Sequence, residues 1–391
     1  MTSGSGEPVR VLIAHNSYQQ RGGEDAVVEA EVSLLRARGH RVELYLRHND
    51  ELRRMSAGAA ARDTIWSERT VRDVERLIAG FRPNVIHVHN SFALISPAIV
   101  AAAAKAGIPL VQTLHNFRLL CLQAALVRDG RVCEDCVGRF PWRGVVHRCY
   151  HGSATQSAVL AAMLGLHRAL GTYRKRVAQY IALSEFSRGR FAAGGIPARR
   201  IAVKPNFAAA PPPPEEPRSG ALFVGRLSSE KGTRVLAALS ATSRSQPVDV
   251  IGEGPDQAQL EALPGIRLLG RQPRATVDAR MREASYLLVP SICYENFPLS
   301  IVEAFAQGLP VIASRLGAMA ELVTPGTTGL LFEPGNAGDL AATMTWADAH
   351  PADMRAMGRA ARREYELKYT PDRNYEMLMR IYRDALSVAR D

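Results

Sequence analysis

Short apolar runs recur along the chain and are separated by longer stretches of mixed polarity. The first run, Arg10–Ala14, is followed by a polar loop, an amphipathic stretch over Glu24–Arg38 and a second run at Arg41–Leu46. Buried parallel strands read as continuous apolar runs and helices read with a period of 3.6 residues, so this order predicts a parallel strand–helix–strand unit. Further strands of the first half are expected at Val85–His89, Pro109–Leu114 and Tyr180–Leu183.

The same rhythm restarts after a proline-rich tract at Ala208–Pro217. Proline continues neither a helix nor a central strand, so the tract predicts a semi-rigid connector between two sheets. The segment Asp372–Arg390 has the pattern of an amphipathic helix. Strands of the second half are expected at Ala221–Val224, Val248–Ile251, Ile266–Leu269, Tyr286–Val289 and Pro310–Ala313.

Length supports the division into two domains, because 391 residues exceed one ordinary hydrophobic core. Two open α/β sheets bind ligands at the carboxyl ends of their strands, so a crevice between the domains is expected. The predicted parts are an N-terminal domain over residues 1–207, a linker over 208–217, a second domain over 218–370 and a C-terminal helix over 371–391 that packs back on the first domain.

Composition narrows the setting. No apolar stretch approaches the roughly 20 residues that cross a bilayer, and the apolar run near the start is too short for a signal-peptide core. We therefore expect a cytoplasmic protein. The net charge is +11, and no nucleic-acid-binding motif accompanies it. Seven basic residues lie close together in the sequence of the first half. Two interpretations fit this group: a solvated surface, or a face that attracts phosphates or the inner face of a membrane. Its members are Arg139, Arg143, Arg148, Arg168, Arg174, Lys175 and Arg176.

The strongest local signal follows the fourth predicted strand of the second half. A polar loop presents Glu295, and Pro298 begins a helix. The free N–H groups around Leu299 and Ser300 suit a diphosphate. Glu303 lies on the first turns of that helix, and two carboxylates there would accept hydrogen bonds from sugar hydroxyls. A helix-stabilising Glu303 and a solvated Glu295 explain the pair equally well when it is taken alone.

A second signal favours the functional interpretation. The stretch Phe223–Gly232 places Arg226 and Lys231 just after the first strand of the second half, and Gly225 and Gly232 leave room for a close backbone approach. Arginine grips a phosphate with two parallel hydrogen bonds and lysine supplies a point charge. Surface basic residues are common, so the weight lies in the combination of both motifs at this spacing.

Over nearly its full length the chain resembles family 4 of the retaining glycosyltransferases, most specifically over Phe223–Ser314. The resemblance implies the α/β GT-B fold, with two Rossmann-like domains facing a central cleft. It implies that Glu295 binds the donor sugar and Glu303 the ribose, while Arg226 and Lys231 stabilise the leaving diphosphate. The remaining donor contacts it implies are Gly225, Asn296, Phe297, Leu299 and Ser300.

The resemblance also covers two features of the first half. It implies that Gly22 and Gly23 face the donor diphosphate and that His115 lies near the anomeric carbon. Without the resemblance, a glycine pair indicates only a turn, and a histidine at the end of a strand is as often structural as functional. The chain departs from the family pattern at Val203–Phe207 and at Gly317–Glu321. Nothing is carried over from those two stretches.

The expected reaction moves a sugar, hexosyl or related, from a nucleotide-diphosphate sugar to a hydroxyl acceptor, in polysaccharide or glycolipid biosynthesis. The chain has no Asp-x-Asp pair, so no catalytic metal is expected and Arg226 and Lys231 would meet the charge of the leaving group. Same-face attack through an oxocarbenium-like state is the working hypothesis, with His115 orienting donor or acceptor. The donor base, the donor sugar and the acceptor (a glycan, a lipid-linked sugar or a small molecule) stay open.

Four of the five cysteines fall in a polar insert over about 118–152, which directly follows His115. A Cys-x2-Cys pair with two flanking thiols offers four tetrahedral ligands, so a structural zinc is one interpretation. Free thiols are the other, and redox chemistry is the third. The insert is expected to border the acceptor side of the cleft. The four residues are Cys121, Cys133, Cys136 and Cys149.

Two other functions compete with transfer. A sugar-nucleotide epimerase uses a related two-domain scaffold but needs acid and base carboxylates in its cleft. A non-catalytic homologue would bind sugar nucleotides, yet the acidic pair, the basic pair and His115 are all intact here. Release of nucleoside diphosphate from a candidate donor separates the three.

Overall fold

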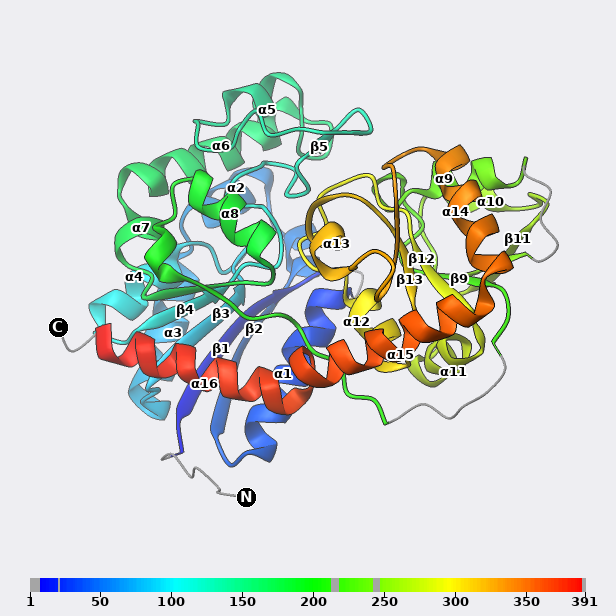
Figure 1. Ribbon diagram of the computed structural model, residues 1–391. Coiled ribbons are helices and arrows are strands. Elements are labelled where there is room, and N and C mark those ends of the chain that lie inside the picture. The colour runs from blue at the N-terminus through cyan, green and yellow to red at the C-terminus, as the bar shows by residue number, and fades with distance from the viewer. Residues whose placement is uncertain (1–7, 20–21, 212–217, 242–246, 389–391) are drawn as a thin grey trace. The chain divides into compact units, whose positions relative to one another are not determined.

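The computed structural model describes residues 8–19, 22–211, 218–241 and 247–388 (Figure 1). The chain divides into two compact units. The first contains residues 1–124, 134–204 and 375–391, and the second contains residues 125–133 and 205–374. Most of the predicted linker, residues 212–217, lies outside the described residues, as does the end of the predicted C-terminal helix.

The first unit is built on a six-stranded parallel sheet in the order β2-β1-β3-β4-β7-β8. The order reverses at β1, which lies between β2 and β3, so the loops after β1 and β3 open at a switch point. The strands are β1 (Arg10–Ser17), β2 (Arg41–His48), β3 (Val85–Asn90), β4 (Leu110–Thr113), β7 (Gln179–Ala182) and β8 (Ile201–Val203).

Helices cover this sheet, and several of them bury apolar residues. The first helix buries Val28, Val32 and Leu35 on one face. The last helix carries Tyr382 into the same core, where its hydroxyl lies 2.8 Å from His87 Nδ1. The helices are α1 (Gly23–Ala37), η1 (Asn49–Arg54), α2 (Ala57–Ile65), α3 (Glu68–Phe81), α4 (Ala98–Lys105), α5 (Trp142–Val146), α6 (Ala154–Ala169), α7 (Thr172–Lys175), α8 (Glu185–Ala193), η2 (Ala198–Arg200) and α16 (Pro371–Val388).

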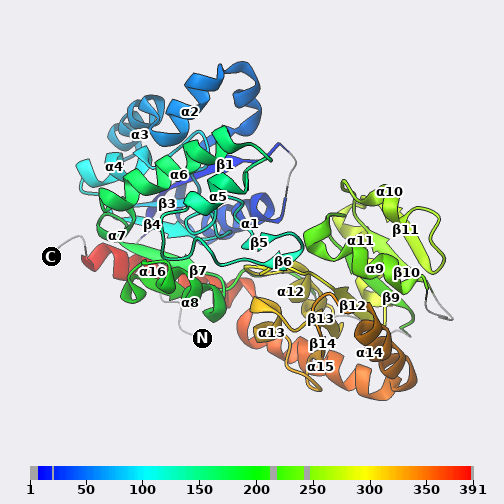
Figure 2. The ribbon, with the colours of Figure 1, turned by 90° about the horizontal axis from the view of Figure 1, so that it is seen from above.

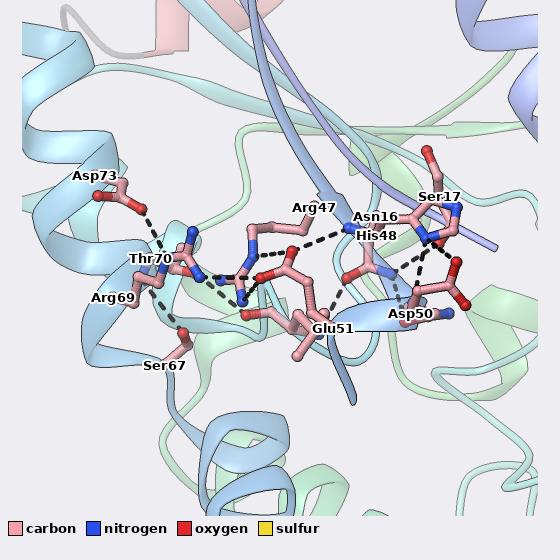
Figure 3. A network of polar contacts seen from close by, with 12 residues as sticks. Asn16, Ser17, Arg47, His48, Asp50, Glu51, Ser67, Arg69, Thr70 and Asp73 are labelled. Atoms are coloured by element: carbon pink, nitrogen blue, oxygen red, sulfur yellow. Dashed lines mark hydrogen bonds and ion pairs between the residues drawn. The ribbon is translucent and has the colours of Figure 1, made fainter. Parts of the chain in front are cut away.

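A polar network ties β2 to the helices that follow it (Figure 3). The guanidinium of Arg47 donates to both carboxylate oxygens of Glu51, at 2.8 and 2.9 Å. Arg69 on α3 donates to the same carboxylate at 3.0 Å and pairs with Asp73. Glu51 therefore links η1 to a strand and to a helix through charge-assisted hydrogen bonds.

The second unit has a six-stranded parallel sheet in the order β11-β10-β9-β12-β13-β14. Numbered within the unit this is 3-2-1-4-5-6, the order of dinucleotide-binding sheets, with its switch point between β9 and β12. Phe223, Leu288 and Phe332 are fully or almost fully buried in its core. The strands are β9 (Ala221–Val224), β10 (Val248–Ile251), β11 (Ile266–Gly270), β12 (Tyr286–Val289), β13 (Val311–Ser314) and β14 (Gly329–Phe332).

The helices of the second unit follow its strands in alternation, as a parallel sheet requires. They are η3 (Ser229–Lys231), α9 (Thr233–Leu239), α10 (Gln257–Leu260), α11 (Arg274–Glu283), α12 (Leu299–Ala306), α13 (Gly317–Leu322), α14 (Ala337–Ala349) and α15 (Pro351–Lys368).

The predicted fold class, two Rossmann-like parallel-sheet halves, is confirmed. Two strands of the six-stranded sheets were missed, β8 and β14, because each is a short run next to proline or glycine. Part of the predicted insert forms a hairpin of β5 (Val127–Arg128) and β6 (Arg131–Val132). Its turn residues, Asp129 and Gly130, both have positive φ, as a two-residue Asp-Gly turn requires.

Candidate functional site

The loops after β9 and β12 meet at the switch point of the second unit and bring two predicted residues together. Lys231 lies at the end of η3, after β9, and Glu295 lies in the loop after β12. Lys231 Nζ donates to Glu295 Oε1 at 2.6 Å, and Ser291 Oγ donates to the same oxygen at 2.7 Å. The two motifs that the sequence linked only by resemblance are therefore in direct contact.

The contact holds both groups in their charged forms. Burial raises the pKa of Glu295, but the Lys231 ammonium and the Ser291 hydroxyl outweigh it, and the net pKa lies below the ordinary value. Burial lowers the pKa of Lys231, but the Glu295 carboxylate outweighs it, and the net pKa is raised. A cation and an anion thus stand side by side at neutral pH.

Arg226 provides a second cation on the same edge of the sheet. It follows β9 directly and is exposed, and within the described residues its side chain has no partner. An unpaired guanidinium in the same loop as Lys231 is suited to an anionic ligand.

Glycines allow the backbone of these loops to pack closely. Gly232 has a φ of +82°, and a Cβ built there would lie 2.0 Å from the carbonyl oxygen of Pro290. A Cβ at Gly252, after β10, would lie 1.8 Å from the carbonyl oxygen of Gly225. Sequence reasoning identified Gly225 and Gly232. It missed Gly252, which only the alignment of neighbouring strands reveals.

Glu303 lies on α12, buried, and accepts a hydrogen bond from the guanidinium of Arg274. Arg274 begins α11 and also pairs with Asp278 at 2.9 Å. Burial raises the pKa of Glu303 above its usual value even though Arg274 opposes the shift. Sequence reasoning missed Arg274, because nothing in the sequence separates it from the other arginines.

The start of α12 carries the remaining predicted donor contacts. Leu299 and Ser300 form its first turn and are half-buried. No described side chain caps that turn, which leaves its N–H groups open to a ligand. Asn296 and Phe297 are buried just before it, and the Phe297 ring packs edge-on against Tyr369.

The predicted residues of the first unit follow its own strands. Gly22 and Gly23 are exposed at the start of α1, and the Gly22 N–H donates to Asp25 Oδ2 at 2.8 Å. His115 follows β4 and is half-buried, with its Nε2 2.9 Å from Nδ1 of His89. The two imidazoles stack with their centroids 5.2 Å apart.

Behind His115 lies a buried charge cluster that sequence reasoning missed. Glu31, on α1, has Lys204 Nζ at 3.0 Å, His87 Nδ1 at 3.0 Å and His89 Nε2 at 3.2 Å. Burial raises the pKa of Glu31, but Lys204 and the histidines bring it well below the ordinary value. The sequence feature that could have revealed this cluster is a glutamate on the apolar face of α1, between Val28 and Val32.

This cluster contains side chains of the kinds that bind metal ions, but its negative charge is already balanced by an ammonium group. Among the described residues, it is the one group of three carboxylate, histidine or cysteine side chains whose ligand atoms lie within 4.8 Å of one another. The Lys204 ammonium already supplies the positive charge that a cation would bring. Both His87 nitrogens have hydroxyl partners at 2.8 Å, from Tyr382 and Thr113.

The four cysteines of the insert do not form a thiolate site in this structure. None of the five cysteines, all of which lie in described ranges, forms a disulfide. Cys121, Cys136 and Cys149 belong to the first unit and do not gather as a group of three ligands within 4.8 Å, while Cys133 falls in the segment grouped with the second unit. The zinc interpretation of the insert stays a prediction, and metal analysis of the purified protein under reducing conditions tests it.

Two further observations bear on the setting. Within residues 8–388, apart from the undescribed segments, no helix is both long and apolar enough to cross a membrane. Several large apolar side chains are nevertheless exposed on α5, on α6 and beside them: Phe140, Trp142, Val146, Leu166 and Leu170.

Comparison with known proteins covers both units. Residues 22–206 match the family described as "Glycosyl transferase 4-like domain", and residues 218–347 match "Glycosyl transferases group 1". A 2-deoxystreptamine glucosyltransferase from Streptomyces kanamyceticus is 28% identical over 338 residues, which is 80% of each protein. A glycogen synthase from Mycobacterium tuberculosis is 34% identical over 160 residues, and the match spans only 38% of its length.

Among solved structures, Anabaena HepE in complex with UDP superposes with a TM-score of 0.66 at 18% identity, covering 95% of this chain and 98% of HepE. That likeness shows the fold. The two matched families together extend over both parallel-sheet units and include both motifs of the switch point. The chain therefore belongs to the GT-B glycosyltransferases of the family 4 type.

Proposed function

We propose that the protein transfers a sugar from a nucleoside-diphosphate sugar to a hydroxyl acceptor with retention of anomeric configuration. The observation that carries the proposal is the Lys231–Glu295 ion pair beside the exposed Arg226, at the switch point of a dinucleotide-binding sheet. Ligands of such sheets bind outside the carboxyl ends of the strands at that point.

The basic pair suits the leaving group. When the bond from the sugar to the diphosphate breaks, negative charge develops on the phosphate oxygens, and Lys231 and Arg226 would stabilise it together with the open N–H groups of α12. These cations are already in place, so little reorganisation accompanies the reaction. No step in this account uses a metal.

The acidic pair suits the two sugars of the donor. Glu295, held ionised by Lys231, accepts hydrogen bonds and would orient the hydroxyls of the transferred sugar. Glu303 would take the ribose hydroxyls, with Arg274 as its partner in the absence of ligand. HepE, whose structure contains UDP, shares the fold, which supports a nucleotide donor here.

The chemistry we propose is same-face substitution. The diphosphate departs, an oxocarbenium-like sugar forms, and the acceptor hydroxyl attacks the same face while its proton passes to a departing phosphate oxygen. Gly22 and Gly23 would approach the diphosphate, and His115 would orient the sugar or the acceptor hydroxyl. The relatives that match the chain support an acceptor that is a glycan, a glycolipid or a small molecule.

We further propose that the first unit binds the anionic inner face of the cytoplasmic membrane. The α5–α6 patch is defined by Phe140, Trp142, Val146, Leu166 and Leu170, and each of these residues is 47–65% exposed. Helices α5 and α6 lie side by side in both views (Figures 1 and 2). A Cβ on Gly165 would meet the Phe140 ring at 2.5 Å, so Phe140 lies directly against α6.

The charge around the patch fits the same partner. Arg139, Arg148, Arg174, Lys175 and Arg176 are exposed near it in sequence. Apolar and aromatic tips combined with several cations are the composition of surfaces that bind anionic lipid headgroups. This contact would bring the enzyme to a lipid-linked acceptor.

Nucleoside diphosphate release tests the proposed transfer. The purified chain is incubated with UDP-, GDP-, ADP- and TDP-sugars, and we expect release from one base series. Lys231→Ala and Glu295→Ala should each lower that release by orders of magnitude. Arg267→Ala is the matched control, because it breaks an exposed contact with Asp249 in the same unit and should leave release unchanged. Near-normal release in both site variants overturns the assignment.

A further inference from the structure

His115 is the outermost member of a series of polar contacts that begins at a buried carboxylate. Glu31 Oε1 lies 3.2 Å from His89 Nε2, and His89 Nδ1 lies 2.9 Å from His115 Nε2. All three side chains belong to the first unit, on α1, on β3 and just after β4. The series therefore runs from the core of that unit to the carboxyl edge of its sheet.

The inner end of the series is fully enclosed. Glu31 is 0% exposed and His89 is 3% exposed. Neither Glu31 Oε1 nor His89 Nε2 makes a well-aligned hydrogen bond with any described residue, including each other. Their 3.2 Å contact is therefore chiefly electrostatic, and the Nε2 atom has only the carboxylate to face.

Charge states along the series are fixed by burial and by Lys204. Glu31 is ionised, because the ammonium 3.0 Å away and two histidines hold its pKa well below normal. Burial and the neighbouring His87 lower the pKa of His89 to about 4. Burial and His89 lower the pKa of His115 well below its usual value. Both imidazoles are thus neutral, and each carries one N–H.

The Glu31 carboxylate then determines which ring nitrogen of His89, and in turn of His115, carries the proton. A carboxylate only accepts, and a bare nitrogen lone pair would be repelled by it, so the N–H of His89 is on Nε2. His89 Nδ1 is then a bare acceptor. The 2.9 Å contact with His115 needs one donor, which places the N–H of His115 on Nε2. Nδ1 of His115 keeps its lone pair and has no hydrogen-bond partner among the described residues.

We propose that Glu31 and His89 are positioning residues that hold His115 as the Nε2–H tautomer, so that it presents an acceptor at Nδ1 to its ligand. Such a histidine accepts a hydrogen bond from a hydroxyl and repels a phosphate or carboxylate oxygen. The group facing His115 is therefore a hydroxyl of the sugar or of the acceptor. Only this last assignment rests on the proposed function.

The tautomer can be read directly by nitrogen NMR. Protein labelled with ¹⁵N at histidine gives two-bond and three-bond proton–nitrogen correlations that separate bare from protonated ring nitrogens. Of the ten histidines, His115 is assigned by the signals that vanish in His115→Gln. We expect a bare Nδ1 and a protonated Nε2. A protonated Nδ1 in the unmodified protein overturns the proposal, whether or not sugar transfer is ever detected.

Glu31→Gln tests the cause, because an amide can donate to His89 Nε2 and so reverse the direction of the series. We expect His115 to shift toward the Nδ1–H tautomer or a mixture. Since this change removes the carboxylate that faces the buried Lys204 ammonium, Glu31→Gln combined with Lys204→Met removes both charges of the pair together. Glu51→Gln is the matched control, since Glu51 is a carboxylate of the same unit that contacts arginines (Figure 3). An unchanged His115 tautomer in folded Glu31→Gln or in the double variant overturns the proposal.

Kinetics separate positioning from a merely structural role. Fixing a ring tautomer through its partner acts on the reacting geometry, so we expect kcat to fall about 10- to 100-fold in the double variant while the donor KM changes little. The Glu51 control should retain both values. A double variant with altered KM and normal kcat would contradict the positioning role.

Discussion

Lys231 Nζ lies 2.6 Å from Glu295 Oε1, although 64 positions separate the two residues in the chain. The contact exists because β9 and β12 are neighbours in the sheet, so that the loops following them open at the same edge. Each residue stabilises the charged form of the other, as the proposed roles of a catalytic cation and a sugar-binding carboxylate require. The pair is therefore the natural starting point for experiment.

The Lys231–Glu295 ion pair should stabilise the folded protein at neutral pH and lose this effect in acid. The pKa of Glu295 is lowered in the folded protein, so its stabilisation is present above the unfolded value of 4.5 and is lost as the pH falls through the folded value. At neutral pH, Glu295→Gln should lower the free energy of unfolding by about 2 kcal/mol, the range for hydrogen bonds to charged groups. Urea unfolding at neutral pH and about one unit below 4.5 measures this, and we expect the difference to shrink in acid.

The matching control for this measurement is Arg267→Ala, whose exposed guanidinium contacts the half-buried Asp249 on a neighbouring strand of the same sheet. It should change the free energy of unfolding by less than about 1 kcal/mol. A Glu295→Gln effect that grows in acid would show that the carboxylate is not stabilised in its charged form.

Sequence patterns predicted much of this architecture. The bounds of β9, β10 and β12 agree with the predicted apolar runs because each is a buried strand flanked by clear turn residues. Gly225, Arg226, Lys231 and Glu295 were all singled out before any geometry was considered, since two dense motifs carried them.

Sequence patterns did not predict the contacts between segments that are distant in the chain. Arg274 meets Glu303 only because α11 and α12 are brought together by folding, and an arginine after a proline has no distinctive pattern. The Glu31–Lys204 contact likewise joins residues 173 positions apart. Burial of charge is what makes both contacts consequential, and a one-dimensional pattern does not report it.

Glu303 should bind the ribose of the donor. Glu303→Gln is expected to weaken binding of the preferred nucleoside diphosphate about tenfold, which corresponds to about 1.4 kcal/mol. Calorimetric titration with the ribonucleotide and its deoxyribose analogues forms a double cycle. Removing the contacted hydroxyl should weaken binding to the unmodified protein but have little further effect on Glu303→Gln. Fully additive losses would contradict a direct contact.

Gly232 should be intolerant of a side chain for steric as well as conformational reasons. Gly232→Ala places a Cβ against the Pro290 carbonyl oxygen and strains a φ of +82°. Gly265 has a similar φ of +77° with nothing within 4 Å, so Gly265→Ala isolates the conformational cost of about 1 kcal/mol. Thermal unfolding should show a larger loss for Gly232→Ala, together with reduced donor turnover. Equal losses at the two positions would contradict the close packing of these loops.

The α5–α6 patch should bind anionic vesicles. Sedimentation with phosphatidylglycerol vesicles should retain the protein at low salt, and phosphatidylcholine vesicles should not, because the attraction is partly electrostatic and is screened by salt. Trp142→Ser should reduce the bound fraction several-fold. Trp346→Ser is the matched control, since Trp346 is 40% exposed in the second unit. Equal binding to both vesicle types would contradict the proposed surface.

The most direct test of the proposed transfer is the anomeric configuration of the product formed from an α-linked nucleoside-diphosphate sugar, followed by NMR during turnover. The account predicts an α-linked product, made at a rate that falls by orders of magnitude in Lys231→Ala and in Glu295→Ala while the Arg267→Ala control stays active. A β-linked product, or full activity in both site variants, would contradict it.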